Sequence, residues 1–160
     1  ETGSMTKEEY SRYEEGKVDF SVTMLCKCAD RLGVDVTALF TGHTPKLKGH
    51  SIVRKGEGLK VERRQSFSYQ HLASTFRGRL GEPFEVVAPF NKDEQDKEIA
   101  LSTHEGQEMD YILEGSLKVV INGHTDVLNE GDTVFYDSSQ PHGMIATGGK
   151  PCRFLAILFK

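Results

Sequence analysis

Two histidines and a glutamate have the residue types and the spacing of a metal site. His104 and Glu108 lie four residues apart at the start of an apolar segment, and His142 follows a Gly-Asp turn and a second apolar segment. Two imidazoles and one carboxylate suit Fe(II), Mn or Ni with open coordination positions, or a Zn ion. The sequence therefore predicts a divalent-metal site at these three residues. The alternative is that the three side chains bond to one another and to a small polar ligand.

Strand alternation adds candidates for ligand binding beside this site. If Glu108 faces the interior of a barrel, Asp110 faces it too, because side chains on a strand repeat every two residues. Two carboxylates in one cavity require a cation, an arginine or a polar ligand nearby. The alternative is a local bulge that turns Asp110 to solvent. The other candidates are Gln107 at the cavity mouth, Met144 with the parity of the second histidine, and Tyr69 and His71, of which His71 also fits the role of a core histidine.

Short stretches of alternating apolar and polar residues run from about residue 50 to the end of the chain. Asn122-Gly123 between two of them predicts a type I′ hairpin. Many short strands with no helix between them predict an antiparallel sandwich or barrel. The expected strands are Ser51–Lys55, Leu59–Arg64, Phe67–Leu72, Phe84–Ala88, Glu98–Leu101, Glu108–Leu113, Leu117–Ile121, Thr125–Leu128, Thr133–Tyr136, Gly143–Ala146 and Arg153–Phe159.

Residues 1–42 have a helical period instead. Capping patterns and turn glycines predict three short helices with tight connections. The expected caps at their starts are Thr6, Ser21 and Asp35, and the glycines at their ends are Gly16, Gly33 and Gly42. Three helices of this length form only a small unit.

The composition limits the function classes. The chain has 160 residues, 20 Lys and Arg against 24 Asp and Glu, and a net charge of -4. It contains no run of 18 apolar residues, which excludes a membrane-spanning helix. The mild acidity argues against a surface that binds nucleic acid everywhere, but it leaves room for a small DNA-binding face. Three cysteines without regular spacing predict no disulfide framework, and together with the lack of a signal-like leader they predict a cytoplasmic protein.

Two motifs in the β segment match a known pattern. The first comprises His104, Glu108 and the run from Tyr111 to Gly115, and the second comprises Gly131-Asp132 and Pro141-His142. With these motifs, residues from about 50 to 160 resemble the cupin superfamily. The resemblance implies a mainly β fold, the cupin double-stranded β-helix or jelly-roll barrel.

One position departs from the cupin pattern. Ser102 stands where the first motif usually begins with a histidine. The resemblance therefore implies a three-ligand site at His104, Glu108 and His142 in place of a four-ligand one, and many regulatory relatives with incomplete ligand sets bind no metal.

A further set of residues marks the N-terminal helices. They are Thr6, Tyr10, Tyr13, Glu14 and Gly16, then Leu25, Ala29, Leu32, Gly33 and Val34, then Leu39 and Phe40. With them, residues from Met5 to Gly42 resemble the last three of the five helices of an Xre-type helix-turn-helix domain. The resemblance implies that the chain begins inside that domain.

The resemblance also makes the first of these helices the recognition helix, with Thr6, Lys7 and Arg12 as DNA-binding residues. Residues 1–45 contain five Lys and Arg but eight Asp and Glu, whereas a DNA-binding face needs cations to neutralise phosphates. The alternative is that this unit serves packing or dimerisation only.

The sequence thus predicts a small partial helix-turn-helix helical unit at residues 1–43, a linker at 44–50 and a cupin β-barrel sensor domain at 51–160. The leading hypothesis is a transcriptional regulator, a homodimer that binds operator DNA and a small-molecule effector and does not bind membranes. The first alternative is a metal-dependent cupin enzyme of the dioxygenase or isomerase type. The second is a non-catalytic binding module whose helices recruit a protein partner.

Overall fold

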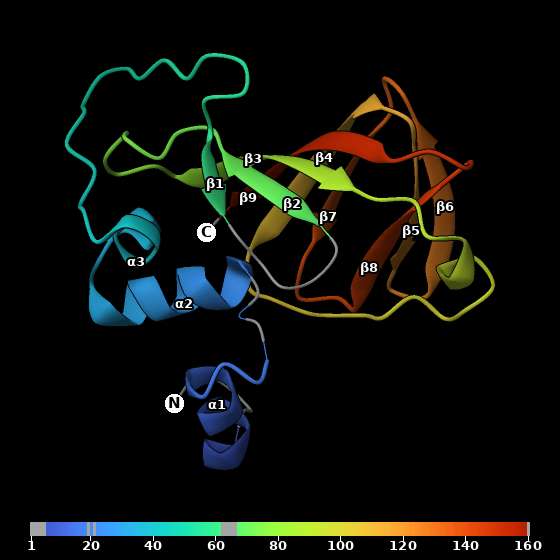
Figure 1. The fold of residues 1–160 in the computed structure, drawn as a ribbon, viewed down its shortest axis with the longest axis horizontal. Helices are drawn as coiled ribbons and strands as arrows, with labels where there is room; N and C mark the ends of the chain where they lie inside the picture. Colours follow the sequence, from blue (N-terminus) through green and yellow to red (C-terminus); the bar gives the residue numbers. More distant parts are fainter. Residues whose placement is uncertain (1–5, 19, 21, 62–66, 160) are drawn as a thin grey trace.

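The computed structural model of the chain describes residues 6–18, 20, 22–61 and 67–159. Two antiparallel sheets form the larger part of the molecule, and three short helices lie at one end of it (Figure 1). The fold is mainly β, as the sequence predicts. The described residues contain no helix that is both long and apolar enough to span a membrane.

The first and third helices begin at their predicted caps, and all three helices end just before the predicted glycines. They are α1 (Lys7–Glu14), α2 (Val22–Leu32) and α3 (Val36–Thr41). Thr6 forms a capping box, in which its Oγ1 accepts from the Glu9 N–H at 3.2 Å and its own N–H donates to the Glu9 carboxylate at 2.8 Å. Asp35 caps α3, and Gly42 ends it with a φ of 72°. The predicted cap of α2 at Ser21 lies outside the described residues.

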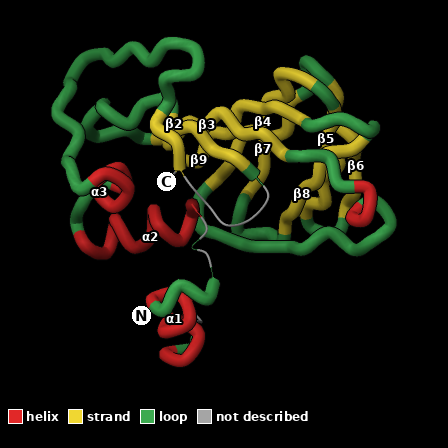
Figure 2. The backbone as a smooth tube through the Cα atoms, viewed as in Figure 1, coloured by secondary structure: helices red, strands yellow, loops and turns green. Residues whose placement is uncertain are grey.

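Nine strands form the two sheets (Figure 2). Asn122 and Gly123 both have positive φ between β5 and β6, which confirms the predicted hairpin. The six-stranded sheet has the order β1 (Leu59–Val61), β2 (Ser68–His71), β3 (Gly81–Ala88), β9 (Cys152–Phe159), β4 (Gln107–Glu114) and β7 (Thr133–Asp137). The three-stranded sheet has the order β6 (His124–Asn129), β5 (Ser116–Ile121) and β8 (His142–Thr147), and a short 3₁₀ helix, η1, spans Lys92–Glu94.

Two predicted strands are wrong. Residues 51–55 have irregular backbone, and Ile52 is 67% exposed because no neighbouring strand covers it. Residues 98–101 are also irregular, and the pairing that follows them is a single bridge between Ser102 and His142. This segment passes so close to β8 that a Cβ atom on Gly143 would lie 2.3 Å from the Ala100 carbonyl oxygen. Apolar alternation alone does not show whether a partner strand lies alongside.

The helices share one hydrophobic core with the barrel. Val22, Cys26 and Ala29 of α2 and Val36 of α3 are buried in the same cluster as the inward residues of β3, β4 and β9. Figure 1 shows α2 and α3 beside the β1–β2–β3 part of the larger sheet, with α1 further away. The buried face of α2 therefore depends on the barrel for its burial.

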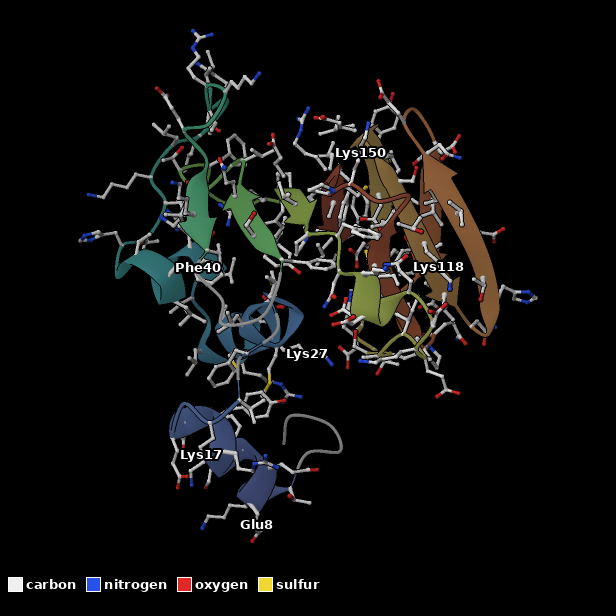
Figure 3. All side chains as sticks on the ribbon, turned by 45° about the vertical axis from the view of Figure 1, so that its right-hand side comes forward. Glu8, Lys17, Lys27, Phe40, Lys118 and Lys150 are labelled. Atoms are coloured by element: carbon white, nitrogen blue, oxygen red, sulfur yellow. The ribbon has the colours of Figure 1, made fainter. Side chains whose placement is uncertain are left out.

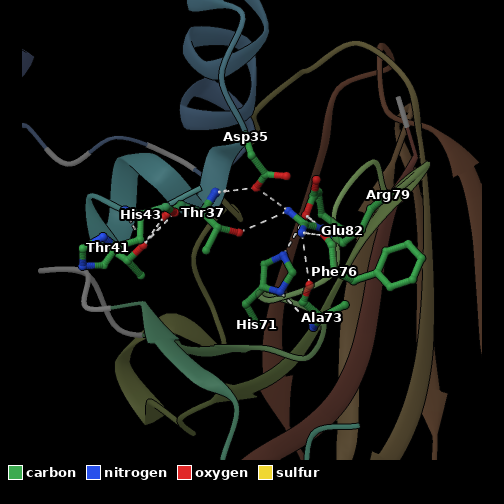
Figure 4. Close-up of polar contacts among 9 residues, drawn as sticks. All are labelled: Asp35, Thr37, Thr41, His43, His71, Ala73, Phe76, Arg79 and Glu82. Carbon is green, nitrogen blue, oxygen red and sulfur yellow. Dashed lines mark hydrogen bonds and ion pairs between the residues drawn. The ribbon is translucent and has the colours of Figure 1, made fainter. Parts of the chain in front are cut away.

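A buried ion cluster also joins the helices to the barrel (Figure 4). The Arg79 guanidinium donates to Asp35 at 2.7 Å and to Thr37 at 3.2 Å, both in the first turn of α3, and to Glu82 of β3 at 2.8 Å. It also donates to the carbonyl oxygens of Ala73 and Phe76 in the loop before β3. A side chain that is 4% exposed thus bonds to three separate parts of the chain.

Glu82 extends the cluster to β2. Its carboxylate lies 2.6 Å from His71 Nε2, while His71 Nδ1 accepts from the Ala73 N–H at 3.0 Å. Burial alone would raise the pKa of Glu82, but the hydrogen bonds from His71 and Arg79 outweigh it and lower that pKa. The pKa of Asp35 is lowered in the same way, against its burial, by the Thr37 N–H and Arg79.

The substitution Arg79→Met should destabilise the protein by about 3–5 kcal/mol, because it leaves the carboxylates of Asp35 and Glu82 without their cation. Chemical denaturation measures this. The matched control is Arg153→Met, since the side chain of Arg153 is 36% exposed and lies 3.4 Å from Glu114. The control should cost less than about 1 kcal/mol. Equal losses for the two variants would contradict a structural role for the Arg79 cluster.

The stability difference between wild type and Arg79→Met should also depend on pH. The lowered pKa values of Asp35 and Glu82 stabilise the fold above their ordinary values of 3.8 and 4.5. This contribution is lost as the pH falls through the lower pKa values of the folded protein. The difference should therefore shrink as the pH is lowered below about 4.

Candidate metal and ligand site

The barrel brings His104, Glu108 and His142 together. Glu108 lies on β4, His142 begins β8, and His104 lies in the segment before β4. All three side chains are buried, and their nearest ligand atoms lie within 4.8 Å of one another. His104 Nε2 lies 3.1 Å from the Glu108 carboxylate. Ligands about 2.1 Å from one metal ion and at right angles lie about 3 Å apart, so this pair has the spacing of a metal site.

Backbone carbonyl groups orient both imidazoles. His104 Nδ1 lies 3.2 Å from the Glu105 carbonyl oxygen, and His142 Nδ1 lies 2.8 Å from that of Gln140. A carbonyl oxygen only accepts, so each Nδ1 carries a proton and, in the neutral ring, each Nε2 carries a lone pair. Such outer hydrogen bonds are the usual support of metal-binding histidines.

This arrangement leaves two acceptors side by side. With a neutral ring, His104 Nε2 and the Glu108 carboxylate oxygen can be neighbours at 3.1 Å only if a proton or a cation lies between them. A divalent ion satisfies both atoms and the Nε2 atom of His142. The residues present therefore fit a metal ion with two nitrogen ligands and one oxygen ligand.

A cavity of about 310 Å³ opens beside the three residues. This volume is near the lower end for sites that bind small molecules. Its wall is mainly apolar, with few polar groups beyond the candidate ligands. It is lined by Val22, Phe67, Tyr69, Phe84, Val86, Ala100, Ser102, His104, Glu108, Tyr136, His142, Gly143, Met144, Phe154, Ala156 and Leu158.

Near the triad lie buried polar groups that have no hydrogen-bond partner within the described part of the chain. They are both carboxylate oxygens of Asp110, the Tyr136 hydroxyl and the Ser138 hydroxyl. Burial raises the pKa of Asp110, and the adjacent Glu108 carboxylate raises it further. The same two causes raise the pKa of Tyr136. Groups of this kind are costly in a barrel that holds no cation or polar ligand.

The other predicted ligand-binding residues separate into two groups. Tyr69 and Met144 line the cavity. Asp110 is fully buried, as strand alternation predicts, but does not line the cavity, and Gln107 is exposed at the start of β4. His71 is fully buried against Phe84 and bonded to Glu82, which is the arrangement of a core histidine.

The predicted DNA-binding residues lie on or beside α1. Lys7 and Arg12 are exposed on that helix, whereas the side chain of Thr6 is engaged in the capping box. Cys26 is buried and Cys28 half-buried on α2, and neither forms a disulfide. Among the described residues, no buried residue belongs to α1.

Sequence reasoning missed part of the cavity wall. Phe84 and Val86 on β3, and Phe154 and Ala156 on β9, face inward with strict alternation. The same two-residue period that placed Asp110 inside could have found them, since both strands were predicted. The contribution of Val22 could not be found in this way, because it depends on how α2 packs against the barrel.

Comparison with known proteins agrees with this geometry. The family model described as a cupin domain matches residues 93–158. This segment contains all three members of the triad and the strands β4 to β8. No curated protein matches the sequence significantly.

Solved structures share the fold beyond that segment. A transcriptional regulator of the HTH_3 family from Vibrio cholerae is 20% identical, with a TM-score of 0.62 over 99% of this chain and 82% of that one. Hydroxypropylphosphonic acid epoxidase from S. wedmorenis is 25% identical, with a TM-score of 0.58 over 96% and 83%. An RmlC-like cupin from Shewanella frigidimarina is 17% identical, with a TM-score of 0.54 over 69% and 91%. Residues 93–158 thus match a cupin domain, and these solved structures share the fold of the larger part of the chain, in which three short helices precede the strands.

Proposed function

We propose that this chain belongs to a cytoplasmic, DNA-binding transcriptional regulator whose cupin barrel binds a small-molecule effector or a divalent metal. The full-length protein acts as a homodimer and contacts operator DNA through its N-terminal helices, with Thr6, Lys7 and Arg12 at or next to the DNA. The fold likeness to the Vibrio cholerae regulator supports this proposal, because it extends over 99% of the chain and so includes the helices.

The observation that carries the proposal is that helix α2 forms part of the wall of the barrel cavity. Val22 of α2 lines the same cavity as the triad and is only 5% exposed. A smaller cavity of about 130 Å³ lies between Cys26 and Lys27 of α2 and His104 of the barrel. A ligand in the barrel would therefore touch the helical part directly. Such contact is the physical requirement for a ligand to change the arrangement of the helices.

The triad is the proposed metal site. The Nε2 atoms of His104 and His142 and the carboxylate of Glu108 would hold the ion, and when bound it would supply Lewis-acid or redox chemistry at its open positions. The chain itself orients both imidazoles through backbone carbonyls. Apolar side chains, among them Phe84 and Phe154, line the cavity beside the site.

Replacing His142 with alanine should lower the affinity for Mn²⁺ by more than about 10-fold, because it removes one of three ligands. Titration calorimetry with Mn²⁺ measures the affinity, and mass spectrometry of the purified chain measures the metal content. The matched control is His124→Ala, since His124 is an exposed histidine at the start of β6. Unchanged binding by His142→Ala would exclude the triad as the metal site.

The regulator proposal predicts that the full-length protein binds DNA from its own upstream region in a sequence-specific, salt-dependent manner. Adding Mn²⁺ or the effector should change that affinity by about 5-fold or more, the usual size of an allosteric coupling. Electrophoretic mobility shift measures the affinity for this DNA, and unrelated DNA serves as the comparison. Absence of specific binding in both the loaded and the metal-free protein would rule out the regulator.

A metal-dependent enzyme is the second candidate, and the triad itself is the observation that favours it. Two histidines and one carboxylate with open positions form the ligand set of non-haem iron oxygenases. One structural neighbour with this fold, hydroxypropylphosphonic acid epoxidase, is an enzyme. The helical wall of the cavity fits both functions. Turnover of a small hydroxylated acid by the Fe(II)-loaded chain would favour the enzyme over the regulator.

A further inference from the structure

The segment that joins α3 to β1 is strongly basic in an acidic protein. Residues 43–58 contain four Lys and Arg and one Glu, whereas the whole chain has a net charge of -4. Residues 43–58, here called the strap, have irregular backbone apart from one bridge at Leu47. Figure 1 shows the strap along the outside of the molecule, at the end that carries the helices.

The cations of the strap are exposed and unneutralised. The side chains of Lys46, Lys48, Arg54 and Lys55 are all exposed. Within the part of the chain that the structure describes, no ion pair joins any of them to a carboxylate. Cations without carboxylate partners are available to an anionic partner.

Backbone hydrogen bonds fix part of the strap in place. The Leu47 N–H donates to the Thr75 carbonyl at 3.1 Å, and the Arg77 N–H donates to the Leu47 carbonyl at 2.9 Å. Lys46 and Lys48 flank Leu47, so the same bonds bring them next to Arg77, which is also exposed. Three cations from two separate segments are thus held on a positioned backbone.

We propose that Lys46, Lys48 and Arg77 form a contact surface for the phosphate backbone of duplex DNA. This inference rests on the proposed function. The N-terminal unit, residues 1–45, carries more acidic than basic residues and lacks the cations that phosphate contacts require. The strap follows that unit directly and supplies them. Phosphate contacts position a protein on the duplex without reading its sequence, which exposed lysines and an arginine can do.

Duplex DNA fits these residues better than a protein partner does. Stable protein interfaces depend on buried aromatic or apolar anchors. In the described part of the strap, the exposed large apolar side chains are those of Leu47 and Ile52, and neither is aromatic. The charged groups of these lysines and this arginine lie at the ends of long, flexible side chains. They can therefore each reach a phosphate group of the duplex.

The test uses the whole chain and a labelled duplex of unrelated sequence. Fluorescence anisotropy over a series of KCl concentrations gives the slope of log affinity against log salt. The variant K46Q/K48Q/R77Q should bind more weakly than wild type, and its slope should be smaller by about 3, because each lost phosphate contact removes about 0.9. The matched control is K92Q/K97Q/K150Q, three lysines that are also exposed. Figure 3 shows Lys150 above the strands of the barrel, away from Phe40 of α3.

Three other outcomes would overturn the inference, and a fourth would overturn the regulator proposal. Equal slopes for the variant and the control would show that the strap does not contact phosphates. Wild-type chain that binds phosphatidylglycerol vesicles but not the duplex would assign the surface to lipid. If the full-length protein binds its operator and the strap variant leaves that affinity and slope unchanged, the strap inference fails while the regulator proposal stands. Failure of the wild-type full-length protein to bind its operator would overturn the regulator proposal instead.

Discussion

The buried guanidinium of Arg79 joins the helices of this protein to its barrel. A buried arginine must be both neutralised and hydrogen-bonded, so its partners are fixed relative to one another. These partners are the first turn of α3, through Asp35, and strand β3, through Glu82. Glu82 also bonds to His71, whose ring packs against Phe84 in the cavity wall. Because α2 leads into α3 through a three-residue connection, this cluster also places α2 against the barrel, where Val22 lines the cavity.

Several polar side chains are buried inside the barrel at the same end. A purely structural barrel would fill this space with apolar side chains. Here two histidines, two carboxyl groups and a tyrosine hydroxyl are buried together, and several of their atoms have no hydrogen-bond partner among the described residues. Such a set is destabilising on its own, since each unsatisfied group loses its hydration. A metal ion and a polar ligand are the species that would satisfy it, which is why the triad has the central place in the proposed function.

The sequence was sufficient for the features that depend on local chemistry. Capping residues placed the ends of α1 and α3, Asn122-Gly123 placed a hairpin, and two-residue periodicity placed Glu108 and Asp110 inside. Residue types and spacing proposed the three candidate ligands, and the cupin resemblance supplied the fold. The sequence was insufficient where the outcome depends on distant neighbours. Residues 51–55 have strand-like residues but no partner strand, and the cluster around Arg79 joins residues that are 44 apart in the chain.

The central claim is that occupancy of the barrel changes the state of the helices. Hydrogen exchange of the backbone amides, with and without Mn²⁺, tests it most directly because each segment reports separately. If the helices respond to the barrel, Mn²⁺ should slow exchange both in the segment from His104 to Asp110 and in α2. Protection confined to the barrel strands, with α2 exchanging at the same rate in both states, would contradict the claim.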